Sequence, residues 1–326
     1  MEMSRALGAL WGLAIGDALG MPTQDMHPDL IRADYGVVDR LIPAGPNQRI
    51  AAGAPAGMIT DDTEQALILA RLLAQDGFVD PLRLSVEMLA WEDDMRARGS
   101  LDLLGPSTRG ALARIRDGVA PSEAGQQGTT NGAAMRVAPV ALTVPAQPLD
   151  NLVDAVVVAS EITHGTSVAL AGAAAVAAVV AAGIDGADKN AAIAYGIEAA
   201  QLAGGRGHQA PRPDIATRAR WAIPMLATAD NKIDALFHII GTSMESHESV
   251  VAALAITALD ISDWDAVCLA ANAGGDTDTV AAMVGAMRGA MSGVDTWPQD
   301  VVALISETNS LDLTDIAQEL VARKSQ

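Results

Sequence analysis

Apolar residues recur every three to four positions along almost the whole chain, the spacing that places them on one face of an α-helix. Alternating runs of β-branched and aromatic residues, which would indicate strands joined by hairpin turns, are missing. The pattern therefore predicts an all-α protein. The predicted helices span residues 4–19, 61–76, 81–98, 106–117, 132–142, 150–162, 166–183, 188–203, 213–228, 233–243, 247–259, 263–273, 277–292, 298–308 and 311–323.

Segments rich in Gly and Pro separate these helices and are expected to form loops, at 43–58, 145–148 and 204–214. Each is followed directly by another apolar helix of the same small-residue composition, so none has the character of a linker between domains. The sequence also contains no repeat of fixed period. We therefore expect residues 1–326 to form one domain.

The composition indicates how such helices pack. Half of the residues are hydrophobic and 19% are charged, which supplies enough apolar surface for a large core and excludes general disorder. The aromatic residues are only five Trp, two Tyr and two Phe. The core must therefore be filled mainly by Ala, Gly, Val and Leu, whose small side chains let helices approach closely.

The charge balance excludes two classes of partner. Forty acidic residues against 21 basic residues give a net charge of -19. This charge opposes binding to nucleic-acid polymers and to anionic bilayers, because both carry the same sign. We expect neither nucleic acid nor a membrane as a partner.

Three features bear on the cellular compartment. Cys268 is the only cysteine and cannot form an intramolecular disulfide, which is typical of a reducing compartment. The N-terminal segment carries one Arg, and Asp17 interrupts its apolar stretch, so it does not resemble a signal peptide. The apolar run at 168–184 is short and weakly hydrophobic for a membrane span, and we predict a buried central helix there. A cytoplasmic protein is expected.

Two acidic segments stand out from this background, at 57–73 (GMITDDTEQALILARLL) and 272–287 (NAGGDTDTVAAMVGAM). In each, a Gly-containing turn leads into Thr and Asp residues where an apolar helix is predicted to begin. Taken singly, either segment is explained by helix capping. In the first, Thr60 or Asp61 would accept the free N–H groups of the first turn, and Glu64 would complete a capping box.

Capping needs one side chain, whereas these segments place four carboxylates beside apolar helices, which is costly if they converge without a cation. If the two helix starts face each other, they form an all-oxygen cage that suits Mg²⁺, Mn²⁺ or Ca²⁺ rather than zinc. Such a cage has room for two cations about 3.5–4 Å apart and for water and substrate, as in a metal-dependent hydrolase. Its donors would be Thr60, Asp61, Asp62, Asp276, Asp278 and Thr279.

Two further charged residues have open interpretations. Asp17 lies between glycines at the end of the first predicted helix and is as readily a structural residue as a functional one. Arg136 would be able to pair with phosphate, but its distance from the preceding turn favours a structural ion pair. Neither residue is assigned to the site.

Five short motifs occur in the order and approximate spacing of the ADP-ribosylglycohydrolase family: GDALG at 16–20, TDDT at 60–63, NGAAMR at 131–136, TH at 163–164 and GGDTDT at 274–279. Over essentially its whole length, the chain resembles this family, which includes dinitrogenase reductase-activating glycohydrolase and the ADP-ribosylarginine and ADP-ribosylserine hydrolases. The resemblance implies an orthogonal helical bundle with a binuclear Mg²⁺ or Mn²⁺ centre. Such a centre would cleave the bond at C1″ of an ADP-ribosylated protein or small conjugate and release ADP-ribose. The family's metal ligands fall on the six residues of the cage.

The resemblance also assigns substrate contacts. Around Asn131, small residues leave backbone N–H groups free to cradle a pyrophosphate, and in the family this segment contacts ADP-ribose. His164 as a lone histidine would more often be a cap or core residue, but the family motif places it against the substrate ribose. A similar helix start within 104–115 supplies secondary phosphate or ribose candidates, although an ordinary capped helix explains it at least as well. The expected substrate-binding residues are Asn131, Gly132, Ala133, Ala134, His164, Gly105, Ser107 and Gly275, with Thr108 as a further candidate.

Gln24 departs from the family pattern, in which a Glu usually ends the GDALGxPxE motif. In relatives that Glu lies beside the metals, whereas Gln can neither ionise nor act as a general base. We therefore expect Asp62 or Asp278 to act as the base toward metal-activated water, with Gln24 in the place of the usual carboxylate. Two alternatives stay open: a smaller ribosyl or nucleoside conjugate as substrate, and a weakly active or inactive ADP-ribose-binding protein.

Overall fold

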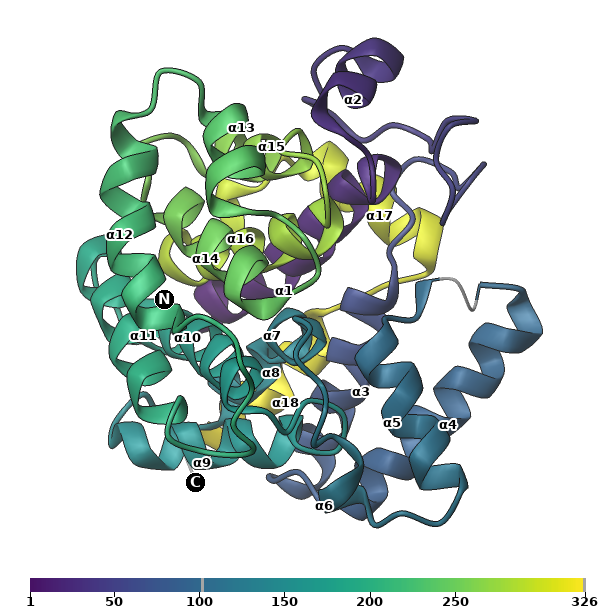
Figure 1. Cartoon of the computed structure of the whole chain (residues 1–326), viewed down its shortest axis with the longest axis vertical. Coiled ribbons are helices and arrows are strands. Elements are labelled where there is room, and N and C mark those ends of the chain that lie inside the picture. Colours follow the sequence, from purple (N-terminus) through teal and green to yellow (C-terminus); the bar gives the residue numbers. More distant parts are fainter. Residues whose placement is uncertain (101–102, 325–326) are drawn as a thin grey trace.

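The computed structural model describes residues 1–100 and 103–324, and these residues form a helical bundle without any β-strand (Figure 1). The predicted all-α fold is therefore confirmed. The helices are α1 (Glu2–Gly20), η1 (Met21–Thr23), α2 (Pro28–Tyr35), α3 (Asp61–Asp76), α4 (Pro81–Arg98), α5 (Pro106–Arg116), α6 (Pro121–Ala124), α7 (Gly132–Arg136), α8 (Ala138–Thr143), α9 (Leu149–Ser160), α10 (Ser167–Ile184), α11 (Lys189–Ala203), α12 (Ile215–Thr228), α13 (Lys232–Asp234), η3 (Ala235–Ile240), α14 (Ser246–Ala258), α15 (Asp263–Ala271), α16 (Thr277–Ser292), η4 (Val294–Thr296), α17 (Gln299–Asn309) and α18 (Thr314–Lys324).

Most predicted helices are found within a few residues of their expected ends, and three differences have local causes. The helix predicted at 132–142 is two helices, α7 and α8, because Pro139 cannot continue the hydrogen-bond ladder and lies in the first turn of α8. The helix predicted at 233–243 begins as the single turn α13 and continues as the π-helix η3. Two short helices, α2 and α6, occur where none is predicted, and each begins at a proline.

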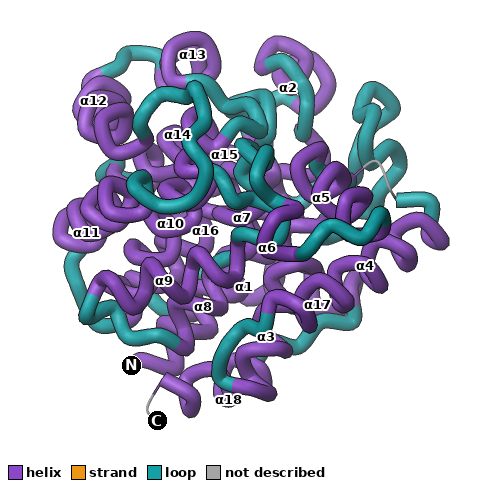
Figure 2. The backbone as a smooth tube through the Cα atoms, turned by 60° about the horizontal axis from the view of Figure 1, so that its bottom comes forward, coloured by secondary structure: helices purple, strands orange, loops and turns teal. Residues whose placement is uncertain are grey.

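α10 is the central helix of the bundle. Every residue of α10 is buried, and the helix packs against α9, α11 and α16 among others (Figure 2). With 18 residues and a mean hydropathy of 2.2, α10 is long and apolar enough to cross a membrane. All of its residues, however, are buried by the rest of the structure. The prediction of a buried central helix is confirmed.

Glycines bring α1 and α16 into backbone contact. A Cβ atom added at Gly12 would lie 2.1 Å from the carbonyl oxygen of Gly285, and one added at Gly285 would lie 1.9 Å from that of Gly12. Since real Cβ atoms cannot approach so closely, only glycine fits at this crossing. At the far end of the same contact, a Cβ at Gly20 would lie 2.5 Å from the backbone of Asp278. The small-residue composition thus places the end of α1 directly against the start of α16.

Candidate active site

A carboxylate from another helix holds the start of α3. Asp17 on α1 is fully buried and accepts hydrogen bonds from the backbone N–H groups of Thr60 and Thr63, at 3.0 and 3.1 Å. It also accepts from the hydroxyls of the same two residues, at 2.8 and 2.5 Å. Burial raises the pKa of Asp17 to about 6, while these hydrogen bonds act in the opposite direction. Asp17 thus caps the N-terminus of α3 from another helix, since it accepts from the N–H groups of the N-cap residue Thr60 and of Thr63.

The capping interpretation of the Thr60 to Glu64 segment is wrong. The hydroxyl of Thr60 donates to Asp17 instead of capping its own helix, and Glu64 accepts from the indole N–H of Trp91 at 2.7 Å and pairs with Arg98 at 2.9 Å. No capping box forms between residues 61 and 64. Because Asp17 satisfies the N–H groups that a cap would serve, the carboxylates of Asp61 and Asp62 are free for another role.

The starts of α3 and α16 lie side by side, as the oxygen cage requires. Oδ2 of Asp62 lies 3.4 Å from the hydroxyl oxygens of both Thr60 and Thr279. Burial first, and then the neighbouring Asp278 carboxylate, raises the pKa of Asp62 well above its usual range. Burial and then Asp276 have the same effect on the pKa of Asp278. The structure thus brings buried carboxyl groups together, where burial and mutual repulsion oppose their ionisation.

Several oxygens of this cluster lack a hydrogen bond. Oδ1 of Asp62, both carboxylate oxygens of Asp278 and Oε1 of Gln24 are buried without a partner in the described part of the chain. Such groups are costly to bury, and carboxylate and amide oxygens are the ligands that hard cations take. Within residues 1–100 and 103–324, no three His, Cys, Asp or Glu side chains are placed to hold a metal ion on their own. The unpartnered oxygens are nevertheless of the kind that hard cations take, and a bound cation would offset the repulsion among the carboxylates.

Asp61 is oriented by a buried relay. Its Oδ2 accepts from the amide of Gln65 at 2.9 Å, and the Gln65 carbonyl accepts from the Arg136 guanidinium at 2.8 Å. Burial lowers the pKa of Arg136 to about 10, opposed by the nearby Asp61 carboxylate. The expected ion pair of Arg136 is therefore wrong in detail, because a neutral glutamine stands between the two charges.

Asn131 ties the segment before α7 to the acidic cluster. Its side-chain amide donates to Oδ2 of Asp276 at 2.6 Å and to the hydroxyl of Ser249 at 2.9 Å. Desolvation raises the pKa of Asp276, and hydrogen bonds from side chains including those of Asn131, Thr279 and Gln24 oppose the shift. The expected phosphate cradle therefore lies directly beside one of the expected metal ligands.

His164 packs against the segment that contains Thr130 and Gly132. It is fully buried, and its two ring nitrogens lie 3.0 Å from the hydroxyl of Thr130 and 2.7 Å from that of Thr163. Burial, and then the Arg136 charge, lowers its pKa well below the usual range, so the imidazole is neutral. A Cβ added at Gly132 would lie 2.8 Å from the His164 ring. The structure thus gives His164 a packing position under Gly132, and direct contact with a substrate ribose stays a prediction.

Two cavities flank the acidic cluster. The small cavity, of about 150 Å³, is lined by Asp61 and Thr279 together with three of the expected substrate-binding residues, Gly105, Asn131 and Gly132. Thr108 also lines it, while Ser107 accepts a hydrogen bond from the backbone N–H of Thr130 at 3.4 Å beside it. Ala133 and Ala134 are buried in the start of α7. The four residues shared with the large cavity are Gln24, Ile50, Met244 and Asp276.

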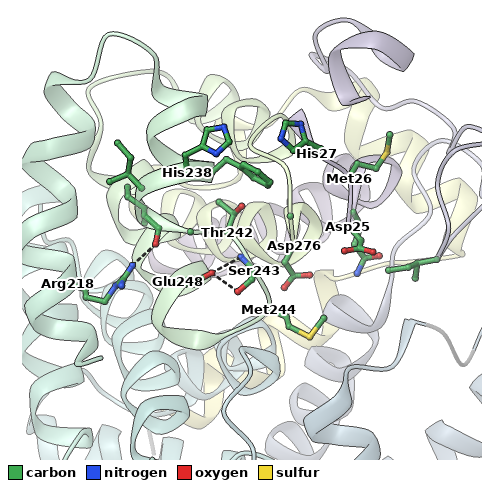
Figure 3. Close-up of a pocket in the computed structure, with 17 residues that line it drawn as sticks. Asp25, Met26, His27, Arg218, His238, Thr242, Ser243, Met244, Glu248 and Asp276 are labelled. Carbon is green, nitrogen blue, oxygen red and sulfur yellow. Dashed lines mark hydrogen bonds between the residues drawn. The ribbon is translucent and has the colours of Figure 1, made fainter. Parts of the chain in front are cut away.

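The large cavity, of about 630 Å³, was not predicted from the sequence. Gly275 lines it in a left-handed conformation, with φ of +73°, and its backbone pairs with that of Met26. In Figure 3, His27 and His238 lie at one side of this cavity, and Asp276 and Met244 lie at the other. Its remaining walls are the π-helix η3 and the loop that follows it. Motifs of the sequence supply only Gln24, Gly275 and Asp276 to its lining, and its two histidines lie in segments without metal or catalytic spacing.

Comparison with known proteins defines the class to which this fold and site belong. The family model described as ADP-ribosylglycohydrolase matches residues 2–326. The chain therefore belongs to the ADP-ribosylglycohydrolase family, and it is a glycosidic hydrolase.

Individual relatives agree with this assignment. The ADP-ribosyl-[dinitrogen reductase] glycohydrolase of Rhodospirillum rubrum is 31% identical, over 90% of this chain and 87% of that protein. The ADP-ribosylarginine hydrolase Tri1 of Pseudomonas putida is 29% identical over 99% and 80%, and the uncharacterized protein YegU of Escherichia coli is 34% identical over 100% and 99%. A solved structure titled ADP-ribosylglycohydrolase-related protein complex superposes with a TM-score of 0.76 at 27% identity, covering 99% of each chain.

Proposed function

We propose that this protein is a binuclear-metal-dependent hydrolase that cleaves the glycosidic bond at C1″ of an ADP-ribosylated protein or small conjugate and releases ADP-ribose. One observation carries the proposal: two helix starts from opposite ends of the sequence bring unpartnered, buried carboxylate oxygens together beside a segment of small residues. Neither capping nor ion pairing uses these oxygens. A cytoplasmic location is part of the same proposal.

The donor set fits two Mg²⁺ or Mn²⁺ ions. The proposed ligands are all oxygens, which suits hard cations. When bound, such ions would supply Lewis acidity and lower the pKa of a water molecule. Ligation would also relieve the repulsion that raises the pKa values of the buried aspartates. The proposed ligands are Thr60, Asp61, Asp62, Asp276, Asp278 and Thr279.

Residues of the chain would orient a metal ligand, accept a proton from water and bind the pyrophosphate. Asp17 holds the Thr60 hydroxyl by its proton, which leaves the oxygen lone pairs of Thr60 available to a ligand. Oδ1 of Asp62, or a carboxylate oxygen of Asp278, would accept the proton of the attacking water, since no described residue donates to either. The backbone N–H groups at the start of α7 would hold the pyrophosphate in the small cavity.

Metal removal tests the proposal. We expect ADP-ribose release from an ADP-ribosylarginine-bearing protein to stop in EDTA and to return with Mg²⁺ or Mn²⁺. The metal should also stabilise the fold by about 2.7 kcal/mol at a hundredfold excess over Kd, seen as a higher melting temperature. Equal release and equal melting temperatures in EDTA and in metal would show that the carboxylates serve no cation.

Gln24 supports a second candidate function, because it lines both cavities and its Oε1 is buried and unpartnered within the described residues. A neutral amide at this position is compatible with a smaller ribosyl or nucleoside conjugate as substrate, or with an ADP-ribose-binding protein of low activity. Turnover of a small conjugate without turnover of modified protein would favour the first. Tight binding of ADP-ribose without turnover of any linkage would favour the second.

Substitution of this residue separates the candidates. We expect Gln24→Glu to raise the rate on arginine-linked ADP-ribose about tenfold, because a restored carboxylate worth about 1.4 kcal/mol in the transition state would orient metal or water. Initial rates and metal affinity should be measured on both proteins. A lower rate on every ADP-ribosyl linkage at unchanged metal affinity would mean instead that Gln24 recognises substrate through its amide.

A further inference from the structure

A fully buried guanidinium lies near the acidic cluster and forms no ion pair within the described residues. Arg136 is among the largest side chains that the structure buries completely. Its terminal nitrogens donate to Oε1 of Gln65 at 2.8 Å, to the hydroxyl of Thr163 at 2.7 Å and to the carbonyl of Ala159 at 3.4 Å. All three partners are neutral. Because an unpaired buried charge is costly, this arrangement points to a role for Arg136 other than ion pairing.

Arg136 fixes the direction of the hydrogen bonds around it, because a guanidinium has N–H donors and no acceptor. Oε1 of Gln65 accepts from Arg136, so the Gln65 amide presents its N–H groups to Oδ2 of Asp61, at 2.9 Å. The Thr163 hydroxyl likewise accepts from Arg136. One buried cation therefore sets the orientation of two neighbouring polar side chains.

The Thr163 hydroxyl passes this direction on to His164. Thr163 is fully buried, and the acceptor for its proton among the described residues is Nδ1 of His164, at 2.7 Å. Burial, and then the Arg136 charge, lowers the pKa of His164 well below its usual range, so the ring is neutral and carries one proton. Because Nδ1 accepts from Thr163, that proton is on Nε2.

The reverse direction would leave a buried donor unsatisfied. If Nδ1 of His164 carried the proton, Thr163 would accept from both His164 and Arg136, and its own proton would have no partner in the described part of the chain. A buried hydroxyl proton without an acceptor costs about 1–3 kcal/mol. The Nε2-protonated ring is therefore the favoured tautomer.

The relay ends at Thr130, where Nε2 of His164 donates to the hydroxyl oxygen at 3.0 Å. The proton of the Thr130 hydroxyl then has no acceptor within residues 1–100 and 103–324. Thr130 is 7% exposed and lines the small cavity. Three of the proposed metal ligands line the same cavity: Asp61, Asp276 and Thr279. One hydroxyl proton is thus available to a ligand beside the acidic cluster.

The size of the small cavity and the direction of the Thr130 hydroxyl restrict what that ligand can be. A volume of about 150 Å³ holds one ring-sized or phosphate-sized group. A hydroxyl proton selects an oxygen acceptor, which phosphate and ribose both offer, whereas a guanidinium offers only N–H donors. The inference rests on the proposed function, under which C1″ of the ADP-ribosyl group lies beside the proposed metal ligands.

We propose that Thr130 binds the substrate by donating its hydroxyl proton to an oxygen of the ADP-ribosyl group. Thr163 and His164 are then positioning residues, which transmit the direction set by Arg136. His164 acts on the substrate through Thr130 and not by its own contact. The oxygen that accepts belongs to the pyrophosphate or to the ribose that carries C1″, and the two sources are separable by comparing ADP-ribose with ADP.

Calorimetric titration of ADP-ribose and of ADP into the whole chain in millimolar MgCl₂ tests the proposal. We expect Thr130→Val, which keeps the side-chain shape and removes the hydroxyl, to weaken ADP-ribose binding about tenfold through the loss of one hydrogen bond. Thr130→Ser should restore the affinity. An equal loss for ADP assigns the accepting oxygen to the pyrophosphate, and an unchanged affinity for ADP assigns it to the ribose.

Thr143→Val is the matched control. Thr143 is also buried, but its hydroxyl bonds to carbonyls of its own helix, α8, at 3.1 and 3.4 Å. The same loss of a buried threonine hydroxyl should leave the affinity for both ligands unchanged. Weaker binding in this control, equal to that of Thr130→Val, would mean that the effect comes from lost stability and would overturn the assignment.

Nitrogen-15 NMR of the imidazole rings tests the relay without any ligand. We expect the proton of His164 on Nε2, with its signals assigned by their loss in His164→Gln. Thr163→Val should disturb this tautomer and weaken ADP-ribose binding about as much as Thr130→Val, whereas Thr163→Ser should preserve both. A His164 ring protonated on Nδ1 in the unmodified protein would overturn the relay.

The binding assay also separates this inference from the proposed function. Unchanged ADP-ribose affinity in Thr130→Val would overturn the role of its hydroxyl. Binding that depends on Thr130 in a protein that releases no ADP-ribose with metal would overturn the proposed hydrolysis and keep this contact. Metal-dependent release with binding indifferent to Thr130 would do the reverse.

Discussion

Asp278→Ala is expected to lower ADP-ribose release at least about 1,000-fold, which corresponds to about 4 kcal/mol of lost transition-state stabilisation. Asp278 is fully buried and neither carboxylate oxygen has a partner among the described residues, so its only evident role is toward a ligand. The substitution removes a carboxylate whose pKa is raised by burial and by Asp276. The variant should therefore melt at a higher temperature than the unmodified protein in EDTA and gain less from added metal. Rate assays and thermal melts with and without Mg²⁺ measure both effects.

Asp300→Ala is the matched control for this experiment. Asp300 also lies in the first turn of a helix, α17, but its side chain is exposed and far in sequence from either cluster. We expect unchanged release of ADP-ribose and a stability change within about 1 kcal/mol, as for a helix-dipole interaction at the surface. Normal turnover by Asp278→Ala would place the catalytic centre elsewhere.

Asp17→Ala is expected to have the largest effect on stability. The substitution leaves the N–H groups of Thr60 and Thr63 buried and unpaired, and it removes the acceptor of both hydroxyls. Loss of a cap together with unsatisfied buried donors should cost about 3 kcal/mol in the free energy of unfolding. Activity should fall at least about 100-fold, a loss of about 2.7 kcal/mol, because the first turn of α3 carries the proposed ligands. Urea unfolding and rate assays on the same preparation give the two values.

Glu64→Gln distinguishes this anchor from a capping box. Glu64 lies in the same turn of α3 but faces Trp91 and the partly exposed Arg98. Because such an exposed pair is weak, we expect a loss below about 1 kcal/mol and full activity. A large loss with Glu64→Gln combined with a stable, active Asp17→Ala would mean that the start of α3 is held locally.

The sequence was sufficient to predict the helices and the acidic residues at two of their starts. Helical periodicity is a local property, and a run such as 168–184 has no polar face to expose, so its burial in α10 was predictable. The small-residue composition likewise predicted close helix packing, and Gly12 against Gly285 provides it. The order of the short motifs is enough to indicate the family, and the family model matches residues 2–326.

Tertiary structure decided which side chains act together. Asp17 caps a helix whose N-cap residue, Thr60, lies 43 residues later, and Asn131 holds a carboxylate 145 residues away. His164 likewise lies beneath Gly132, where its two hydroxyl partners hold the ring. Sequence spacing gives no information on such pairs, because their distances depend on how the helices cross.

The large cavity was likewise not predictable from the spacing of residues in the sequence. His27, Phe237 and Arg218 lie in three segments that carry no motif, and each is unremarkable alone. They meet because a π-helix, a capped turn and α12 converge over the start of α16. The sequence thus determined the fold class and the acidic donors, since these follow from local pattern and residue chemistry. Only packing determined the cavity, since its shape and its unpartnered groups exist only where distant segments meet.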